Sequence, residues 1–313
     1  MLRNLTGTDL LVHPLCLGGN VFGWGADRDE SFAVLDAYAE AGGNFIDTAD
    51  TYSSWQGTDG GESETIIGDW MAARGNRDSM IIATKVGKAP KLNNLRPETI
   101  HTAMDLSLRR LRTDRIDLYY AHQDHDDPMP EALEAFDSLV RSGKARHLAA
   151  SNYSPDRLAE ALELTAANDW APFVALQPGY NLMQRPAFED ALMPFCLERG
   201  VGTLPYYGLA RGYLTGKYRL GGPEVHSVRA SGASTHVDTH GESVLQVVER
   251  VAQRHGVSMG SVALGWLASR PTVVAPIASA RTVEQLAELL PMATLELSPD
   301  DLDELTAVSG STA

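Results

Sequence analysis

The feature of this sequence that most constrains its fold is an alternation of short apolar runs with longer segments of helical periodicity. Such an alternation is typical of repeated β–α units, which build a parallel sheet. We expect eight strands, at residues 15–17, 44–47, 80–84, 117–122, 145–150, 173–177, 201–205 and 272–276. Eight parallel strands are the number that closes a (β/α)8 barrel of the TIM type.

Between and after these strands, apolar residues recur every three or four positions, which predicts a helix in each segment. The expected helices cover residues 29–41, 62–74, 97–111, 130–142, 155–168, 187–199, 242–255 and 282–290. Three segments lie outside the repeat. Residues 1–13 are expected to form a β-hairpin over the barrel floor, residues 208–240 a long lid loop after the seventh strand, and an extra helix begins near Ser298. No linker interrupts the pattern, so residues 1–313 are expected to form a single domain.

Charge and composition limit the classes of binding partner and indicate the cellular compartment. A formal net charge of −15 opposes nonspecific binding to nucleic acid or to anionic lipid, because the mean field repels phosphate. The first residues lack an apolar core of signal-peptide length, and no segment reaches the length of a membrane helix. Cys16 and Cys196 are expected to be free thiols, which fits a reducing compartment. We therefore expect a cytoplasmic protein.

Polar residues follow the expected strands, where the catalytic groups of such barrels stand. Asp47 and Tyr52 follow the second strand, Lys85 the third, and His122 ends the fourth. A lysine beside a tyrosine favours the phenolate, which predicts a lowered pKa for Tyr52, with Asp47 holding Lys85 in place. His122 could orient a carbonyl oxygen or complete a proton path. Further polar side chains follow the fifth and sixth strands: Ser151, Asn152 and Gln177.

Four motifs in this order resemble the aldo-keto reductase family: residues 44–52 (NFIDTADTY), 82–85 (IATK), 117–122 (DLYYAH) and 150–153 (ASNY). The resemblance runs from about residue 5 to about residue 305. It implies an NADP-dependent oxidoreductase that interconverts an aldehyde or ketone and an alcohol. It also implies Tyr52 as the general acid, Lys85 and Asp47 as the pair that tunes it, and His122 as the group that orients the substrate.

The resemblance further implies a nicotinamide cofactor. Ser151, Asn152 and Gln177 would bind its carboxamide and Tyr206 would stack on the ring. Residues 204–218 are similar to the family's cofactor loop, in which Leu209 and Arg211 would lie along the pyrophosphate. No Gly-x-Gly-x-x-Gly fingerprint supports a cofactor independently. In the loop after the eighth strand, Arg281 is the cation left to hold a 2′-phosphate, so NADPH is expected and NADH remains open. The full expected cofactor set is Ser151, Asn152, Gln177, Tyr206, Gly208, Leu209, Arg211, Ser279, Arg281, Gln285 and Glu288.

The substrate is expected to be a fairly apolar small-molecule carbonyl or alcohol compound, because aromatic residues follow several strands. The expected pocket residues are Phe22, Trp24, Trp55, Tyr120 and His125. Histidines 125, 226, 236 and 240 show no ligand spacing, so no metal is expected.

Two other functions remain open at this stage. Lys85 could be the nucleophile of a Schiff-base lyase, which needs no nicotinamide. The chain could also be a non-catalytic accessory subunit that binds NADPH, as some members of the family are. The sequence leaves open the physiological substrate, the reaction direction, and whether the protein is a monomer or a homo-oligomer.

Overall fold

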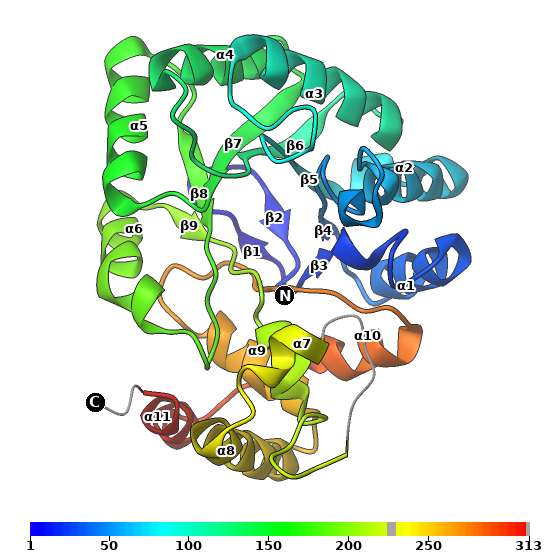
Figure 1. The fold of residues 1–313 in the computed structure, drawn as a ribbon, viewed down its shortest axis with the longest axis vertical. Helices are drawn as coiled ribbons and strands as arrows, with labels where there is room; N and C mark the ends of the chain where they lie inside the picture. The colour runs from blue at the N-terminus through cyan, green and yellow to red at the C-terminus, as the bar shows by residue number, and fades with distance from the viewer. Residues whose placement is uncertain (224–229, 311–313) are drawn as a thin grey trace.

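The computed structural model describes residues 1–223 and 230–310, and it places eight parallel strands in one curled sheet (Figure 1). The order around the sheet is β10, β3, β4, β5, β6, β7, β8, β9. Thr203 of β9 pairs in parallel with Val273, just before β10, so the two edges of the sheet meet. The strands are β3 (Cys16–Gly18), β4 (Phe45–Asp47), β5 (Ile81–Val86), β6 (Ile116–Ala121), β7 (Ala145–Ser151), β8 (Phe173–Gln177), β9 (Gly202–Thr203) and β10 (Ile277–Ala278). The predicted (β/α)8 barrel is confirmed.

The position of the eighth strand was predicted too early, at residues 272–276. Its regular pairing with β3 begins at Ile277, which lies opposite Cys16. Residues 272–276 still bond to both neighbours, since Val274 N donates to Thr203 O at 2.9 Å and Cys16 N donates to Pro276 O at 3.0 Å. Thr272 has a φ of 69° and Pro276 has no N–H to donate, so a regular ladder cannot form there.

Helices cover the outside of the sheet, as Figure 1 shows. The α-helices are α1 (Arg28–Glu40), α2 (Glu62–Arg74), α3 (Pro97–Leu111), α4 (Met129–Arg141), α5 (Pro155–Asn168), α6 (Met193–Arg199), α7 (Ala230–Ser234), α8 (Thr239–His255), α9 (Met259–Ala268), α10 (Val283–Leu289) and α11 (Pro299–Val308). The predicted extra helix at the C-terminal end is α11. Shorter helical segments are the 3-10 turns η1 (Gly19–Val21), η2 (Ser54–Gln56), η3 (Arg77–Ser79), η5 (Ala210–Thr215) and η6 (Leu290–Ala293), and the π segment η4 (Phe188–Leu192).

Helix α9 was not predicted. Every residue of this helix except Met259 is buried, so its sequence shows no polar face and no helical period. It packs between α8, α10 and η5. This packing explains why helical periodicity does not reveal a helix after residue 255.

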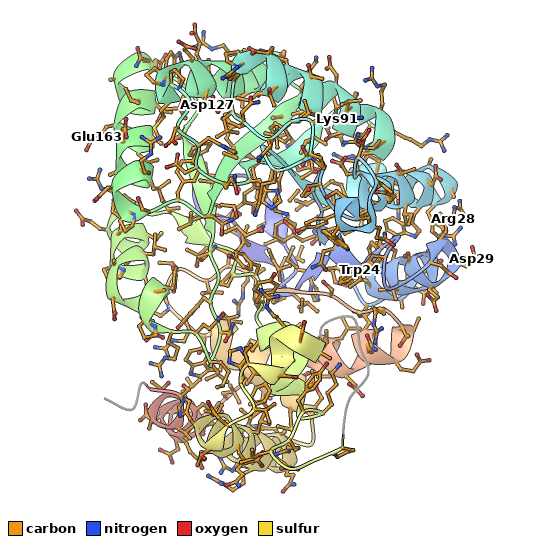
Figure 2. The ribbon with its side chains drawn as sticks, in the orientation of Figure 1. Trp24, Arg28, Asp29, Lys91, Asp127 and Glu163 are labelled. Atoms are coloured by element: carbon orange, nitrogen blue, oxygen red, sulfur yellow. The ribbon has the colours of Figure 1, made fainter. Side chains whose placement is uncertain are left out.

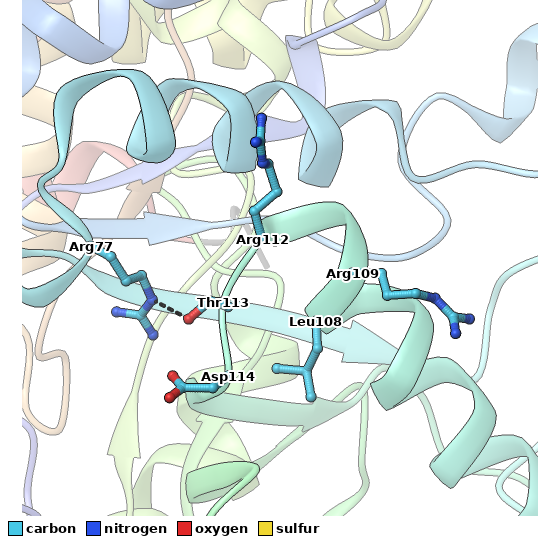
Figure 3. A pocket seen from close by; sticks show the side chains of 6 residues that line it. All are labelled: Arg77, Leu108, Arg109, Arg112, Thr113 and Asp114. Carbon is cyan, nitrogen blue, oxygen red and sulfur yellow. Dashed lines mark hydrogen bonds between the residues drawn. The ribbon is translucent and has the colours of Figure 1, made fainter.

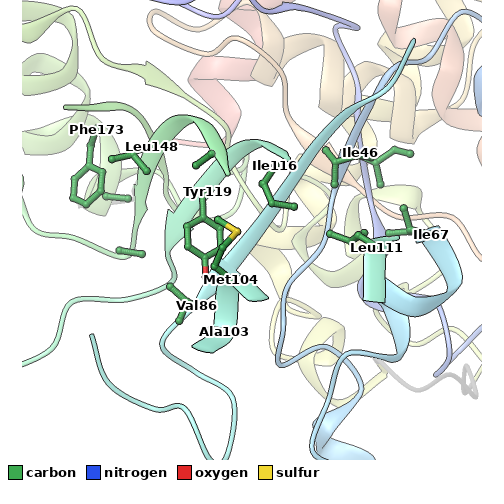
Figure 4. Packing of buried hydrophobic residues seen from close by; sticks show 14 of the residues in the cluster. Ile46, Ile67, Val86, Ala103, Met104, Leu111, Ile116, Tyr119, Leu148 and Phe173 are labelled. Carbon is green, nitrogen blue, oxygen red and sulfur yellow. The ribbon is translucent and has the colours of Figure 1, made fainter. Parts of the chain in front are cut away.

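Two apolar layers lie on either side of the barrel wall. Outside it, strand residues such as Ile46, Ile116 and Tyr119 pack against helix residues such as Met104 and Leu111 (Figure 4). A separate layer fills the barrel interior. Packed layers of this kind leave the ends of the barrel, and not its centre, for function.

The predicted hairpin at the start of the chain is formed by β1 (Arg3–Asn4) and β2 (Leu11–Val12). Leu5, Leu10 and Val12 are fully or almost fully buried and belong to the interior layer of the barrel. The hairpin therefore closes one end of the barrel.

The segment predicted as a lid loop, residues 208–240, contains η5 and α7 and is therefore partly helical. Residues 224–229 of that segment lie outside the described residues. Within the described ranges, no helix is both long enough and apolar enough to cross a membrane.

Candidate active site

A buried ion pair joins the ends of two neighbouring strands. Asp47 is the last residue of β4, and Lys85 is the residue before the last of β5. The Lys85 ammonium lies 2.7 Å from Asp47 Oδ2 and donates to Tyr52 Oη at 3.1 Å. Tyr52 follows β4 in the loop, and its hydroxyl donates to Asp47 Oδ2 at 3.2 Å. The structure thus brings together three of the residues that the sequence singled out.

The polar atoms of this pair are well matched. The Lys85 side chain is 0% exposed, and its third N–H donates to the main-chain oxygen of Thr48 at 2.7 Å. Gln177 at the end of β8 donates its amide to the other oxygen of Asp47 at 2.9 Å. A buried ion pair is tolerated only when its polar atoms are hydrogen-bonded, and these contacts meet that requirement for Asp47 and Lys85. Thr48 was missed by sequence reasoning, because a main-chain acceptor leaves no signal in the residue type.

The pKa of Tyr52 is raised well above its ordinary value, first by burial and then by the Asp47 carboxylate. This direction is opposite to the lowered pKa that the sequence predicted. The physical reason is that Asp47 lies as close to the phenol as Lys85 does, and it opposes the ammonium. The Tyr52 hydroxyl is therefore protonated at neutral pH and can act as a proton donor.

His122 lies directly after β6 and faces the tyrosine. The two rings are 6.3 Å apart between centroids and nearly perpendicular. His122 Nδ1 is buried and has no hydrogen-bond partner within the described residues. Burial, Lys85 and Lys88 hold the pKa of the imidazole well below its usual range, so the ring is neutral at physiological pH. A neutral imidazole can donate one hydrogen bond without competing for the proton of Tyr52.

Ser151, Asn152 and Tyr206 form a connected polar group at the ends of β7 and β9. The Asn152 amide donates to Ser151 Oγ at 3.0 Å and to the main-chain oxygen of His122 at 2.9 Å. Tyr206 Oη donates to Asn152 Oδ1 at 2.8 Å, and Ser151 Oγ donates to the main-chain oxygen of Gln177 at 3.0 Å. Asn152 has a φ of 59°, a conformation that its side-chain bonds help to hold.

The loop after Tyr206 turns sharply, with left-handed φ values at Tyr207, Ala210 and Arg211. The Arg211 guanidinium lies 4.3 Å from the centroid of the Tyr207 ring. Gly208 is buried, and a Cβ there would approach Leu264 Cδ2 to 2.9 Å, so a side chain at this position would displace Leu264. Leu209, the next residue, is half-buried against the core.

The loop after β10 holds the remaining predicted cofactor residues. Ser279 Oγ donates to Asn20 Oδ1 at 2.6 Å, across to the loop after β3. The Arg281 main-chain N–H donates to Gln285 Oε1 at 3.0 Å, which fixes the start of α10. No ion pair involves the Arg281 guanidinium within the described residues, and the side chain of Glu288 is exposed.

Two tryptophan rings form a wall beside the tetrad of Asp47, Tyr52, Lys85 and His122. The Trp24 and Trp55 rings are 5.2 Å apart and nearly perpendicular, and Trp55 lies 6.1 Å from the Tyr52 ring. Trp55 is 49% exposed, and Figure 2 labels Trp24 on the loop after β3. These two tryptophans stand where the sequence placed them, near the tyrosine.

Two predicted pocket residues do not reach a pocket. Phe22 and Tyr120 are both 0% exposed. Side chains alternate along a strand, and in β6 this turns Tyr119 toward the outer layer and Tyr120 into the barrel interior. Phe22 packs in the outer layer. The prediction that they line the substrate pocket was therefore wrong.

His125 is half-buried, and its Nε2 lies 2.7 Å from the main-chain oxygen of Gly87. It ties the loop after β6 to the loop after β5. No group of His, Cys, Asp and Glu side chains within the described ranges could hold a metal ion. His226, one of the histidines considered for a metal, lies outside those residues.

A shallow hollow of about 510 Å³ lies elsewhere on the surface (Figure 3). It is lined by Arg77, Leu108, Arg109, Arg112, Thr113 and Asp114. These residues precede β5, end α3 or join α3 to β6, so the hollow lies at the amino ends of the strands. It is therefore on the opposite side of the barrel from the tetrad and plays no part in the site.

With this geometry established, comparison with known proteins identifies the class. The model of the aldo/keto reductase family matches residues 14–309. The chain belongs to this family of oxidoreductases, and the resemblance seen in the motifs is confirmed.

Particular relatives include reductases and dehydrogenases. Norsolorinic acid reductase B from Aspergillus parasiticus is 30% identical, over 94% of this chain and 80% of that protein. An aryl-alcohol dehydrogenase (NADP(+)) from Phanerodontia chrysosporium is 31% identical, over 96% of this chain and 83% of that protein. The uncharacterised oxidoreductase YrpG from Bacillus subtilis is 32% identical, over 96% of this chain and 93% of that protein.

Proposed function

We propose that this protein is an NADP(H)-dependent reductase that converts an aldehyde or ketone to an alcohol, or catalyses the reverse reaction, in the cytoplasm. The observation that carries the proposal is the buried Asp47–Lys85 pair at 2.7 Å, with the Tyr52 hydroxyl bonded to both members. His122 stands across from Tyr52. A protonated phenol held against an ammonium is suited to donate a proton to a carbonyl oxygen.

The residues around the tetrad fit a nicotinamide nucleotide. Ser151, Asn152 and Gln177 offer hydroxyl and amide groups beside the tetrad, and Tyr206 presents an aromatic ring bonded to Asn152. Arg211 and Arg281 would supply the cations for the phosphates. When bound there, the nucleotide supplies a hydride to the carbonyl carbon.

Each tetrad residue then has one task. Tyr52 gives its proton to the carbonyl oxygen, and Lys85 stabilises the phenolate that remains. Asp47 holds Lys85 in place and charged. His122, neutral at physiological pH, orients the carbonyl oxygen by a hydrogen bond.

The substrate we propose is an apolar, preferably aromatic, carbonyl compound. The Trp24 and Trp55 rings offer faces and edges on which a second ring can stack. Several relatives are named aryl-alcohol dehydrogenases, which supports the same class.

The structural features argue against the Schiff-base alternative. All three N–H groups of Lys85 have acceptors, and the side chain is buried and ion-paired. A nucleophilic lysine must be reachable by a carbonyl carbon, and this side chain is fully buried.

The test is a titration of the purified protein with NADPH and NADH, followed by quenching of tryptophan fluorescence. We expect micromolar binding of NADPH. When benzaldehyde is added, we expect the absorbance of the reduced nucleotide to fall as NADPH is oxidised. Absence of binding by both nucleotides would contradict the proposal. Borohydride trapping of an aldehyde on Lys85 would then support a lyase, and NADPH binding without turnover of a broad carbonyl panel would support an accessory subunit.

A further inference from the structure

Lys88 lies two residues after β5, on a loop held between the two sides of the site. Its main-chain oxygen accepts a hydrogen bond from Thr51 Oγ1 at 3.2 Å, one residue before Tyr52. The preceding oxygen, of Gly87, contacts His125 Nε2 at 2.7 Å. The backbone of Lys88 is thus fixed between the loop that carries the tyrosine and the loop that follows the histidine.

The ammonium of Lys88 has no assigned task. The side chain is exposed, and no hydrogen bond or ion pair involves it in the part of the chain that the structure describes. Lys91, three residues further on and labelled in Figure 2, differs because it bonds to Asp59 at 2.6 Å. Burial contributes most to the lowered pKa of His122, and the charges of Lys85 and then Lys88 lower it further, so Lys88 interacts electrostatically with the group that would orient the carbonyl.

The positive charge of Lys88 is opposite in sign to the net charge of the whole molecule. A formal net charge of −15 gives a mean field that repels anionic small molecules. An anionic substrate would need a local positive charge near the mouth of the site, and Lys88 carries one on a loop that is hydrogen-bonded to the segment just before Tyr52.

We propose that Lys88 binds a carboxylate carried by the substrate, so that the enzyme favours aromatic aldehydes or ketones with a carboxylate on the ring. This inference rests on the proposed reductase function and names its substrate class. Lys88 would be a specificity residue: its ammonium pairs with the carboxylate while Trp24 and Trp55 contact the ring.

The expected gain in kcat/KM depends on the solvent exposure of the Lys88 side chain. A charge pair at a solvent-accessible position contributes modestly, so we expect roughly a fivefold gain in kcat/KM for the carboxylated substrate. Because salt screens such a pair, the gain should shrink as sodium chloride is added.

The experiment compares terephthalaldehydic acid with its methyl ester, which has the same ring and aldehyde but no charge. We expect Lys88→Met to lower kcat/KM for the acid roughly fivefold and to leave the ester within about twofold of wild type. Lys88→Arg should retain the preference for the acid. Lys91→Met is the matched control, since it removes a nearby lysine that already has a partner.

Two results would overturn this inference while leaving the reductase function intact: equal losses for acid and ester in Lys88→Met, or no preference for the acid in wild type. Turnover of the ester by wild type is the separate test of the proposed function. If neither compound is reduced with NADPH or NADH, the proposed function fails and takes this inference with it.

Discussion

At the scale of single residues, the site depends on a pair of buried charges that would be unfavourable apart. Asp47 is 2% exposed and Lys85 is 0% exposed, and each has the other as its counter-charge. Removing one member leaves the other charge buried and unpaired, whereas removing both leaves a neutral site. Stability and activity should therefore respond differently to single and double substitutions.

We predict that Lys85→Met lowers the free energy of unfolding by about 3 to 5 kcal/mol and abolishes most carbonyl reduction. The double variant Asp47→Asn with Lys85→Met should recover much of the stability and none of the activity. Urea unfolding and steady-state turnover measure the two effects. A single variant as stable as wild type would show that the pair is not held as an ion pair.

His122 should make stability fall in acid. Its pKa in the folded protein is well below the value of about 6.5 for an unfolded histidine, mainly because of burial. Between the two pKa values, the unfolded chain therefore binds a proton at His122 that the folded protein does not bind. The contribution of neutral His122 to stability is fully present above the unfolded pKa of about 6.5 and is lost as the pH falls toward the folded pKa.

We predict that His122→Asn reduces this acid dependence by up to about 1.4 kcal/mol per pH unit between pH ~6.5 and ~5. Urea unfolding of both proteins from neutral to acidic pH measures the difference. Parallel stability curves would mean that His122 is protonated to the same extent in both states. Another histidine, His101, is a suitable control, because it lies on the outer face of α3.

Arg281 should decide the choice of nucleotide. We predict that Arg281→Ala weakens NADPH binding roughly tenfold and NADH binding much less, because a charge-assisted contact to the 2′-phosphate is lost. Titration with both nucleotides gives the ratio. An equal effect on both would place the phosphate elsewhere, and Arg211→Ala is then the next variant to measure.

At the scale of elements, periodicity predicted those helices that have one solvent-exposed face and one buried face. Helix α9 escaped because all its faces are buried, and the eighth strand was placed early because the apolar run before Pro276 looked like the strand itself. Phe22 and Tyr120 failed for a related reason. The sequence predicts which side chains are near a strand end, but the direction in which each one points depends on the pleat and on the packing around it.

Helix α11 offers a test of a local stabilising feature. Ser298 accepts from the Asp301 N–H at 3.2 Å, while Asp301 Oδ2 accepts from the Ser298 N–H at 2.9 Å, a reciprocal capping box. We predict that Ser298→Ala lowers the free energy of unfolding by about 1 kcal/mol. Ser243→Ala, at an exposed position within α8, is the control and should be nearly neutral. Equal effects in urea unfolding would contradict this role.

At the scale of the whole molecule, the closed barrel explains why residues far apart in sequence meet. Each loop after a strand opens on the same end, so Asp47, Lys85, His122 and Gln177 come from four strands to one place. The sequence predicted this convergence well, because the order of strands around a parallel barrel follows the order along the chain. It could not predict the sign of the Tyr52 pKa shift, which depends first on how deeply the phenol is buried and then on its distance from the Asp47 carboxylate.

The most direct test of the account is Tyr52→Phe, which removes one hydroxyl and keeps the ring. We predict that NADPH binds this variant nearly as tightly as wild type, while kcat for aldehyde reduction falls by about 100-fold or more, because only the proton donor is lost. Nucleotide titration and turnover on the same preparation give both numbers. Turnover close to wild type would contradict the account, since the proton would then come from another group.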